Sequence, residues 1–151
     1  MQLSSSSIVQ GRIAQPHACR GKGGSDQPLQ LTIRGLPAEA RCIAVVGDEP
    51  DAVKPAGKVW VHWNVFNVPA QGDLDIAAGQ QLAGEAGTTS GGGRGYEGMC
   101  PPDGMHTYRF AVFAFAGPVQ VDTRTAWTID AFEKSYGAQA IGKAQITGTF
   151  Q

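Results

Sequence analysis

The sequence predicts a mainly β protein, a single-domain antiparallel-rich β-sandwich with one C-terminal helix. The chain has 21 glycine and 9 proline residues among 151, which favours many turns and short strands. Several short segments alternate apolar and polar residues, as strands with one buried face do. Only one segment, near the C-terminus, has apolar residues at helical spacing. We therefore expect strands followed by a late helix, in one domain that spans residues 1–151.

The N-terminal third is expected to supply short strands separated by turns. Residues 1–20 predict a short strand with irregular flanks, and the glycine-rich residues 21–26 predict a flexible loop. Residues 29–33 alternate as a strand does, and they end at a Gly-Leu-Pro turn. Residues 42–46 form a continuous apolar run. A run of this kind is typical of a central strand that is buried on both faces.

The middle of the chain combines one strand with two loops. Residues 47–57 are polar, contain proline and carry several carboxylates, so they predict a loop. Residues 58–68 predict a strand. Residues 69–95 are rich in glycine and predict a long loop. Loops of this length within a compact domain usually have a function or are mobile.

The C-terminal third contains the helix and two further strands. Residues 107–115 are aromatic and β-branched, which favours a strand, and residues 140–150 predict the final strand. Residues 123–136 predict a helix that stops at Gly137. The apolar residues with helical spacing are Ala126, Ile129, Phe132 and Tyr136.

Composition and charge narrow the class of partner. Hydrophobic residues make up 42% and charged residues 17% of the chain, which is typical of a globular protein. There are 12 lysine and arginine residues against 13 aspartate and glutamate residues, and no basic run occurs. We therefore expect neither nucleic-acid binding nor membrane insertion.

The cysteines and the N-terminal residues predict a cytoplasmic protein. The first residues lack the basic flank and the long apolar stretch of a secretory signal peptide. The three cysteines, Cys19, Cys42 and Cys100, are odd in number and have no CxxC spacing. This pattern favours reduced thiols over a disulfide framework.

Two histidines lie in the most informative segments of the chain. Residues 59–65 (VWVHWNV) alternate as a strand does, which places Trp60, His62 and Asn64 on one face. Residues 95–110 (GYEGMCPPDGMHTYRF) form a Gly/Pro turn that leads into a strand. Imidazole, phenol and indole groups on neighbouring strands can form a small polar pocket with apolar walls, which suits an oxyanion such as phosphate.

Together with other segments, these motifs carry a resemblance to a known family. The chain resembles the phosphatidylethanolamine-binding proteins, also called Raf kinase inhibitor-like proteins, and most closely their short bacterial members. The matching segments, in order, are residues 49–53 (EPDAV), 60–63 (WVHW), 67–69 (NVP), 95–110 and the closing strand at 142–150.

The resemblance implies a central β-sandwich with a C-terminal helix and one anion pocket. In the family the position of Glu49 is an aspartate that helps to order a pocket histidine, and Val53 stands in place of a proline. Cys100 falls where the family has a small residue beside the pocket, and a filler role is favoured over a reactive thiol. The candidate ligand-binding residues are Glu49, Asp51, Trp60, His62, Cys100, Pro102, His106 and Tyr108.

The predicted function is that of a non-catalytic binding protein. The resemblance implies recognition of a phosphate-like anion, on a phospholipid head group or a phosphorylated side chain. It leaves open a protein partner such as a kinase or protease, and a homodimer. No catalytic residue, cofactor or metal site is expected. Two alternatives remain, a hydrolase or isomerase in which His62 and His106 act as acid and base, and an interaction module with a vestigial pocket.

Overall fold

The computed structural model describes residues 1–151, and strands make up most of its regular structure. A seven-stranded sheet has the order β2-β3-β10-β9-β5-β6-β8, and a three-stranded sheet has the order β1-β4-β7. The strands are β1 (Gln2–Ser4), β2 (Ile8–Val9), β3 (Arg12–Ile13), β4 (Leu31–Arg34), β5 (Cys42–Glu49), β6 (Trp60–Pro69), β7 (Leu74–Ile76), β8 (Glu85–Ala86), β9 (His106–Phe115) and β10 (Gly142–Phe150). The α-helices are α1 (Val53–Ala56) and α2 (Ile129–Tyr136), and the short 3-10 helices are η1 (Gln15–His17), η2 (Arg20–Lys22), η3 (Pro50–Ala52) and η4 (Gly137–Gln139).

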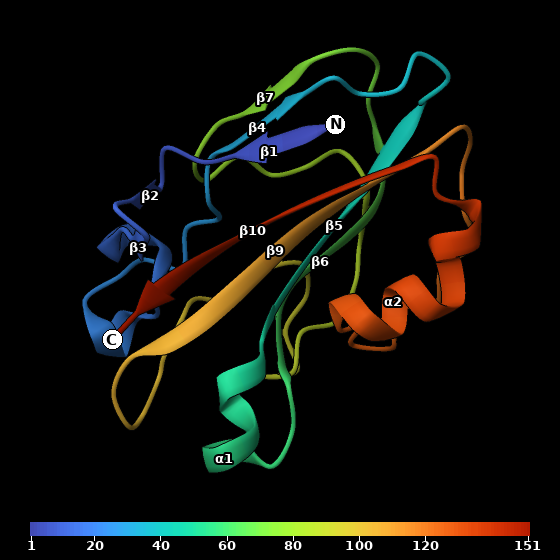
Figure 1. Cartoon of the computed structure of the whole chain (residues 1–151). Helices are drawn as coiled ribbons and strands as arrows, with labels where there is room; N and C mark the ends of the chain where they lie inside the picture. Colours follow the sequence, from blue (N-terminus) through green and yellow to red (C-terminus); the bar gives the residue numbers. More distant parts are fainter.

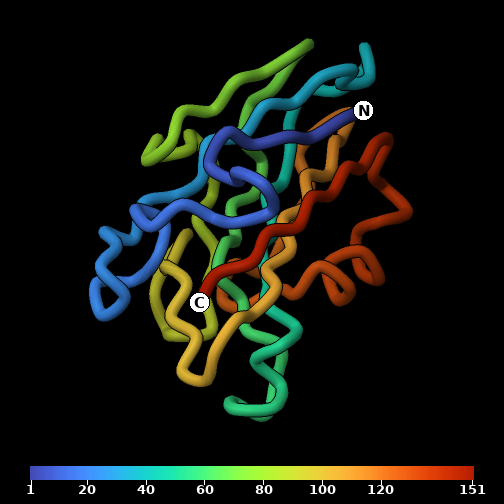
Figure 2. The backbone as a smooth tube through the Cα atoms, turned by 60° about the vertical axis from the view of Figure 1, so that its left-hand side comes forward, coloured from blue at the N-terminus to red at the C-terminus, as the bar shows by residue number.

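The large sheet lies between the small sheet and α2, as Figure 1 shows. One hydrophobic cluster fills the space between the sheets and includes Leu31 and Ile33 of β4. A second cluster lies under α2, where the Phe132 ring stacks on Phe66 with the ring centroids 5.6 Å apart. The prediction of a mainly β, sandwich-like fold with a late helix is confirmed. The N-terminal strand β1 packs beside the final strand β10, which can be followed in Figure 2.

Strand β5 is the centre of the large sheet. It pairs antiparallel with β6 on one side and with β9 on the other. Because side chains alternate along a strand, Ile43 and Val45 face the core between the sheets, while Ala44 and Val46 face α2. Every residue of β5 is buried. The prediction that residues 42–46 form a central buried strand is confirmed.

The C-terminal helix is shorter than the sequence predicts. It begins at Ile129, and the Thr128 hydroxyl accepts a hydrogen bond from the Ala131 N–H as its N-terminal cap. The predicted start at residue 123 is wrong, because residues 122–125 form a turn held by the Asp122 side chain. The helix ends at Tyr136 with Gly137 as its C-terminal cap, so the predicted stop at this glycine is confirmed. Gly137 has a right-handed φ of −59°, and the chain continues into η4.

The two predicted loops contain regular structure. Residues 69–95 include β7 and β8, which extend the small and the large sheet respectively. Residues 47–57 include the end of β5, the 3-10 helix η3 and the short helix α1. The predictions of continuous loops in these two segments are therefore wrong. The chain leaves β5 directly through η3 and α1, and it returns along β6, so this connection lies at one end of the large sheet (Figure 1).

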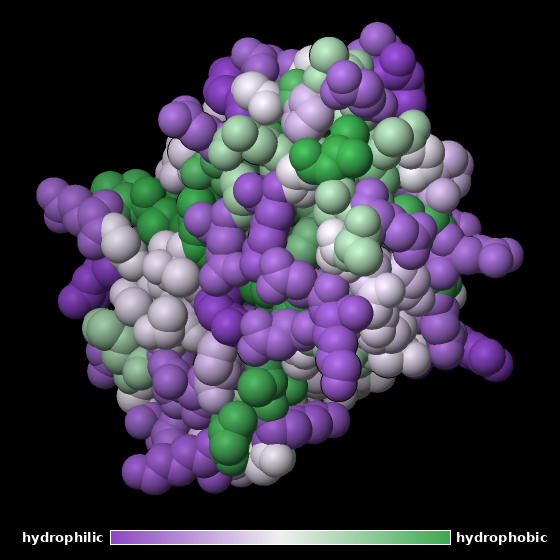
Figure 3. Space-filling model, turned by 45° about the vertical axis from the view of Figure 1, so that its right-hand side comes forward, coloured by the Kyte–Doolittle hydropathy of each residue, from purple (hydrophilic) through white to green (hydrophobic).

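The surface carries separate apolar patches. Figure 3 shows one face on which hydrophilic residues surround several small hydrophobic areas that do not merge. Apolar residues that are scattered over a surface need no partner to explain them. None of the helices is both long and apolar enough to cross a membrane. The large apolar side chains that are exposed are Val9, Val53, Met105 and Ile141.

Candidate ligand-binding site

One carboxylate joins the two histidines that the sequence singles out. Glu49 is the last residue of β5, the strand that lies between β6 and β9. Its Oε2 lies 2.9 Å from Nε2 of His62 on β6, and its Oε1 contacts Nδ1 of His106, the first residue of β9. All three side chains are buried. The prediction of a loop at Glu49 is wrong, and its place on the central strand explains how it contacts both neighbouring strands.

A β-bulge directs His62 toward Glu49. Between Gly47 and Asp48 the register with β6 shifts by one residue, so that His62 has no direct partner on β5. A bulge of this kind re-aims side chains and occurs often beside functional sites. The His62 ring meets Tyr108 edge-on at 5.2 Å, whereas the side chain of Asn64 binds backbone groups of Trp127 near α2. The prediction that Asn64 shares a face with His62 is wrong.

His106 lies between two carboxylates. Besides the contact of its Nδ1 with Glu49, its Nε2 lies 2.5 Å from Oδ1 of Asp103. Burial disfavours the charged ring, but hydrogen bonds to Glu49 and Asp103 outweigh this effect and raise the pKa of His106 above 6.5. A charged imidazole can donate to both carboxylates at once. Burial also opposes the charged form of Glu49, yet hydrogen bonds from His62 and His106 lower its pKa below 4.5.

Glu97 contacts the site from the opposite side of His62. Its backbone carbonyl lies 2.9 Å from Nδ1 of His62, so this nitrogen carries a proton and donates. Its side-chain Oε1 accepts hydrogen bonds from the Trp60 indole and from the Gly91 N–H, each at 2.8 Å. Glu97 thus fixes the loop around residue 91 against β6. The sequence motifs indicated no role for Glu97, although it is one of two acidic residues within residues 95–110.

These side chains face a cavity of about 410 Å³. Six of the predicted site residues line it, and Asp26 and Glu97 add two carboxylates that the sequence did not single out. An apolar wall comes from the segment around α1. The complete lining is Cys19, Asp26, Glu49, Ala52, Pro55, Ala56, Trp60, His62, Glu97, Gly98, Cys100, Pro102 and His106.

Two predicted residues, Asp51 and Tyr108, lie outside the cavity lining. Asp51 is exposed, and its Oδ2 accepts a hydrogen bond of 2.7 Å from the Thr107 N–H at the start of β9. Tyr108 is fully buried behind His62, and its hydroxyl has no hydrogen-bond partner. Burial and the nearby Glu49 carboxylate raise the pKa of this phenol above its usual value. Asp51 holds the backbone next to His106, and Tyr108 packs against the ring of His62. Both residues therefore act on the histidines from outside the cavity.

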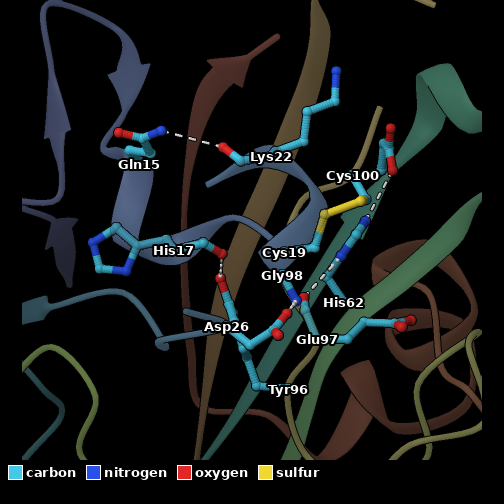
Figure 4. Close-up of a disulfide and its surroundings, with 11 residues drawn as sticks. Gln15, His17, Cys19, Lys22, Asp26, His62, Tyr96, Glu97, Gly98 and Cys100 are labelled. Atoms are coloured by element: carbon cyan, nitrogen blue, oxygen red, sulfur yellow. Dashed lines mark hydrogen bonds and ion pairs between the residues drawn. A yellow bond between two sulfur atoms is a disulfide. The ribbon is translucent and has the colours of Figure 1, made fainter. Parts of the chain in front are cut away.

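A disulfide between Cys19 and Cys100 forms part of the cavity wall. Figure 4 shows it joining the segment around Asp26 to the segment that holds Glu97 and Gly98. The two segments also share a hydrogen bond of 2.9 Å from the Gly98 N–H to Oδ1 of Asp26. The prediction of three reduced thiols is therefore wrong, because cysteines 81 positions apart in the sequence meet in space.

The third cysteine, Cys42, is free and buried at the start of β5. Burial raises the pKa of its thiol, which keeps the sulfur protonated and unreactive. The odd number of cysteines thus reflects one packed thiol together with one disulfide.

Asp48, the acidic residue next to Glu49, does not contact the histidines but binds Arg109 and the start of α2. It is completely buried and accepts hydrogen bonds from Arg109 Nε at 2.7 Å and Nη2 at 2.8 Å. It also accepts from the Ile129 N–H at 2.9 Å, which anchors the first residue of α2 to the sheet. The hydrogen bonds to Asp48 raise the pKa of Arg109, so the guanidinium stays charged. Alternation along β5 sends Asp48 to the α2 side and Glu49 to the cavity side.

The chemistry of the cavity is that of a mixed polar and apolar binding site. It offers two imidazole rings, several carboxylates and an apolar wall that includes Trp60 and Pro55. No group of three or more histidine, cysteine, aspartate or glutamate side chains is arranged to hold a metal ion. The arrangement can accept a small ligand that carries both an anionic and a cationic group.

Relatives of known sequence cover almost the whole chain. The UPF0098 protein of Methanothermobacter thermautotrophicus is 32% identical over 146 residues, which cover 93% of this chain and 91% of that protein. The UPF0098 protein of Chlamydia muridarum is 31% identical and covers 100% of this chain and 99% of its own length. The "Putative lipoprotein LppC" of Mycobacterium tuberculosis is 35% identical over 85% of this chain and 67% of that protein.

Solved structures show the same fold. CT736 from Chlamydia trachomatis superposes with a TM-score of 0.78 at 28% identity, over 99% of this chain and 96% of that one. E. coli YbcL, described as a new member of the mammalian PEBP family, gives a TM-score of 0.82 at 27% identity, over 99% and 97% of the two chains. Residues 4–151 match the sequence model of the family described as phosphatidylethanolamine-binding protein. The chain therefore belongs to the phosphatidylethanolamine-binding protein family.

Proposed function

We propose that this protein is a non-catalytic binding protein whose cavity holds a small phosphate-bearing head group. The observation that carries the proposal is the pair of histidines, His62 and His106, which line one cavity and share one buried carboxylate, Glu49. A charged His106 supplies the positive partner for an oxyanion. The apolar wall around Trp60 lowers the local polarity, which strengthens this attraction.

The charges in the cavity favour a zwitterionic ligand over a free phosphate dianion. Asp26, Glu49 and Glu97 all line the cavity, so a ligand with only negative charge meets like charges there. A phosphate ester that also carries an ammonium group places its cation near these carboxylates. Phosphoethanolamine is a small ligand with both groups, and the family name is consistent with this choice.

The geometry favours binding over acid–base catalysis. The nitrogen atoms of both rings already have partners, which are Glu49 for both rings, the Glu97 carbonyl for His62 and Asp103 for His106. A general base needs a nitrogen that is free to take a proton from the substrate. The lining includes no serine or threonine, and its two cysteines form the disulfide, so no hydroxyl or free thiol lines the cavity as a nucleophile.

The disulfide favours an oxidising compartment as the place where the protein works. Structural disulfides persist outside the reducing cytoplasm, and a relative in Mycobacterium tuberculosis carries the name of a lipoprotein. This proposal replaces the cytoplasmic location that the cysteine count predicted. Fractionation of the native host, followed by alkylation of free thiols in each fraction, tests it. Recovery of the protein with three free thiols from the cytoplasmic fraction contradicts it.

A titration monitored by NMR tests the proposed ligand. Phosphoethanolamine is added to ¹⁵N-labelled protein up to about 20 mM, because a single small anion in a wet cavity binds with a Kd of about 1 mM. We expect the backbone signals of Trp60, Glu97 and Gly98 to shift together with one Kd. Ethanolamine alone and inorganic phosphate are the controls, and each should bind more weakly. An absence of shifts around the cavity overturns the proposal and favours an interaction module with a vestigial pocket.

A further inference from the structure

The histidines of the cavity have no free N–H group for a ligand. His62 donates from Nδ1 to the Glu97 carbonyl, and its Nε2 faces Glu49. His106 contacts Glu49 through Nδ1 and Asp103 through Nε2. An oxyanion can therefore reach an imidazole N–H only by displacing one of these partners.

The partners differ in how firmly they are held. The Glu49 side chain is 6% exposed and bridges two rings, so its removal leaves buried groups without partners. The Glu97 carbonyl belongs to the backbone and also lies beside β6, where the Glu97 N–H donates to the His62 carbonyl. Asp103, in contrast, is 45% exposed, and its one side-chain hydrogen bond is with His106. Asp103 is therefore the partner that can leave at the smallest cost.

The local backbone allows the Asp103 side chain to move. It lies in the turn between Pro102 and Gly104, and Gly104 has a φ of +109°, which favours glycine. Rotation of the side chain into solvent breaks no backbone hydrogen bond, since the Asp103 carboxylate bonds to the ring of His106. The carboxylate is also chemically similar to a ligand oxyanion, because both present negatively charged oxygens to the N–H of the ring.

We propose that Asp103 is an internal competitor, whose carboxylate takes the place of the ligand's oxyanion at Nε2 of His106 and sets the affinity of the cavity. The proposal rests on the proposed binding function and adds the residue that limits it. Only a ligand that displaces Asp103 gains the hydrogen bond to His106. Asp103 thereby selects against weakly bound single anions and keeps His106 paired when the cavity is empty.

Sulfate titrations of variants test this competition, because sulfate does not change its charge near neutral pH. Wild-type protein, Asp103→Ala and Asp130→Asn are compared at one ionic strength and pH 6.5. Asp130 is 79% exposed on α2, so its variant removes one negative charge without altering the contacts of His106. If Asp103 occupies the ring for about nine-tenths of the time, Asp103→Ala binds sulfate about tenfold more tightly. Asp130→Asn should change the Kd less than about twofold, because exposed charges at a distance are screened by salt.

The outcomes separate the two proposals. Equal or weaker sulfate binding by Asp103→Ala, with measurable binding by the wild type, overturns the competition and leaves Asp103 as a residue that orients His106. An absence of sulfate and phosphoethanolamine binding in both proteins overturns the binding function itself. A thermal shift gives a second readout: sulfate should raise the Tm of Asp103→Ala more than that of the wild type. Circular dichroism of each variant shows that it is folded before it is titrated.

Discussion

The carboxylate of Glu49 lies 2.9 Å from Nε2 of His62, and this contact joins the end of the central strand to its neighbour β6. The second oxygen of Glu49 contacts His106 on the other neighbouring strand. The buried Glu49 side chain therefore fixes the positions of both histidine rings. The stability of the sheet at this end and the charge of the cavity depend on the same residue.

Replacement of Glu49 by glutamine should destabilise the fold. The change removes the negative charge between two buried rings, and breaking a buried charged pair costs about 3–5 kcal/mol. Urea unfolding at pH 6 measures the loss. Glu39→Gln is the matched control, because Glu39 is exposed, and we expect a change below about 0.5 kcal/mol. A loss as small as that of the control would show that the histidines do not depend on the Glu49 charge.

Stability should decrease as the pH rises above 6.5. The pKa of His106 is raised in the folded state, so its contribution is complete below the unfolded value of 6.5 and is lost as the pH rises through the folded value. The pKa of Glu49 is lowered, so its contribution is complete above 4.5 and is lost as the pH falls through the folded value. The stabilising contributions of His106 and Glu49 are both complete between pH 4.5 and pH 6.5. Urea unfolding across pH 4 to 9 should give a smaller alkaline decrease in His106→Gln than in the wild type, and equal slopes would contradict the assignment.

The disulfide should contribute substantially to stability. It closes a segment in which the cysteines are 81 positions apart, and a cross-link of this length typically stabilises a fold by about 2–5 kcal/mol. Reduction, or the double change Cys19→Ser and Cys100→Ser, should lower the unfolding free energy by this amount. Alkylation of the denatured, unreduced protein should modify Cys42 alone. Modification of all three cysteines in freshly purified protein would show that the disulfide does not form.

Gly98 should not tolerate a larger residue. A Cβ at this position would lie 2.5 Å from the backbone carbon of Ala18 and 2.5 Å from the nitrogen of Cys19. Gly98→Ala therefore forces two segments of the cavity wall apart, and overpacking of this kind costs about 1–3 kcal/mol. Gly117→Ala is the control, since a Cβ there meets nothing within 4 Å. Similar melting temperatures for the two variants would contradict the close approach.

Much of the fold follows from local sequence patterns. The apolar run at 42–46 predicts the central strand because both of its faces lie in hydrophobic clusters. The start of α2 could not be predicted in this way, because the turn at Asp122 depends on side-chain hydrogen bonds that compete with a helix. Local periodicity likewise does not reveal the bulge at His62, because a bulge is a property of the pairing between two strands.

The candidate site could be predicted only in part. The motifs around His62 and His106 identify the histidines and the proline turn that face the cavity. Asp26 enters the cavity lining because residues far apart in the sequence approach each other closely at Gly98. The cysteine count was misleading for the same reason, since an odd total does not show which pair meets in space. Contacts between distant segments are what the sequence patterns leave out.

The ring signals of His106 provide the most direct test of the proposed binding site. Protein with ¹⁵N-labelled histidine is titrated with phosphoethanolamine at pH 6.5, and His17 is the internal control. His17 is also buried, but its Nδ1 contacts the Gln27 carbonyl, and it does not line the cavity. We predict that the Nε2 signal of His106 shifts with a Kd of about 1 mM, while the signals of His17 stay constant. If the His106 signals stay unchanged at phosphoethanolamine concentrations that saturate the shifts of other signals, the proposed binding site is contradicted.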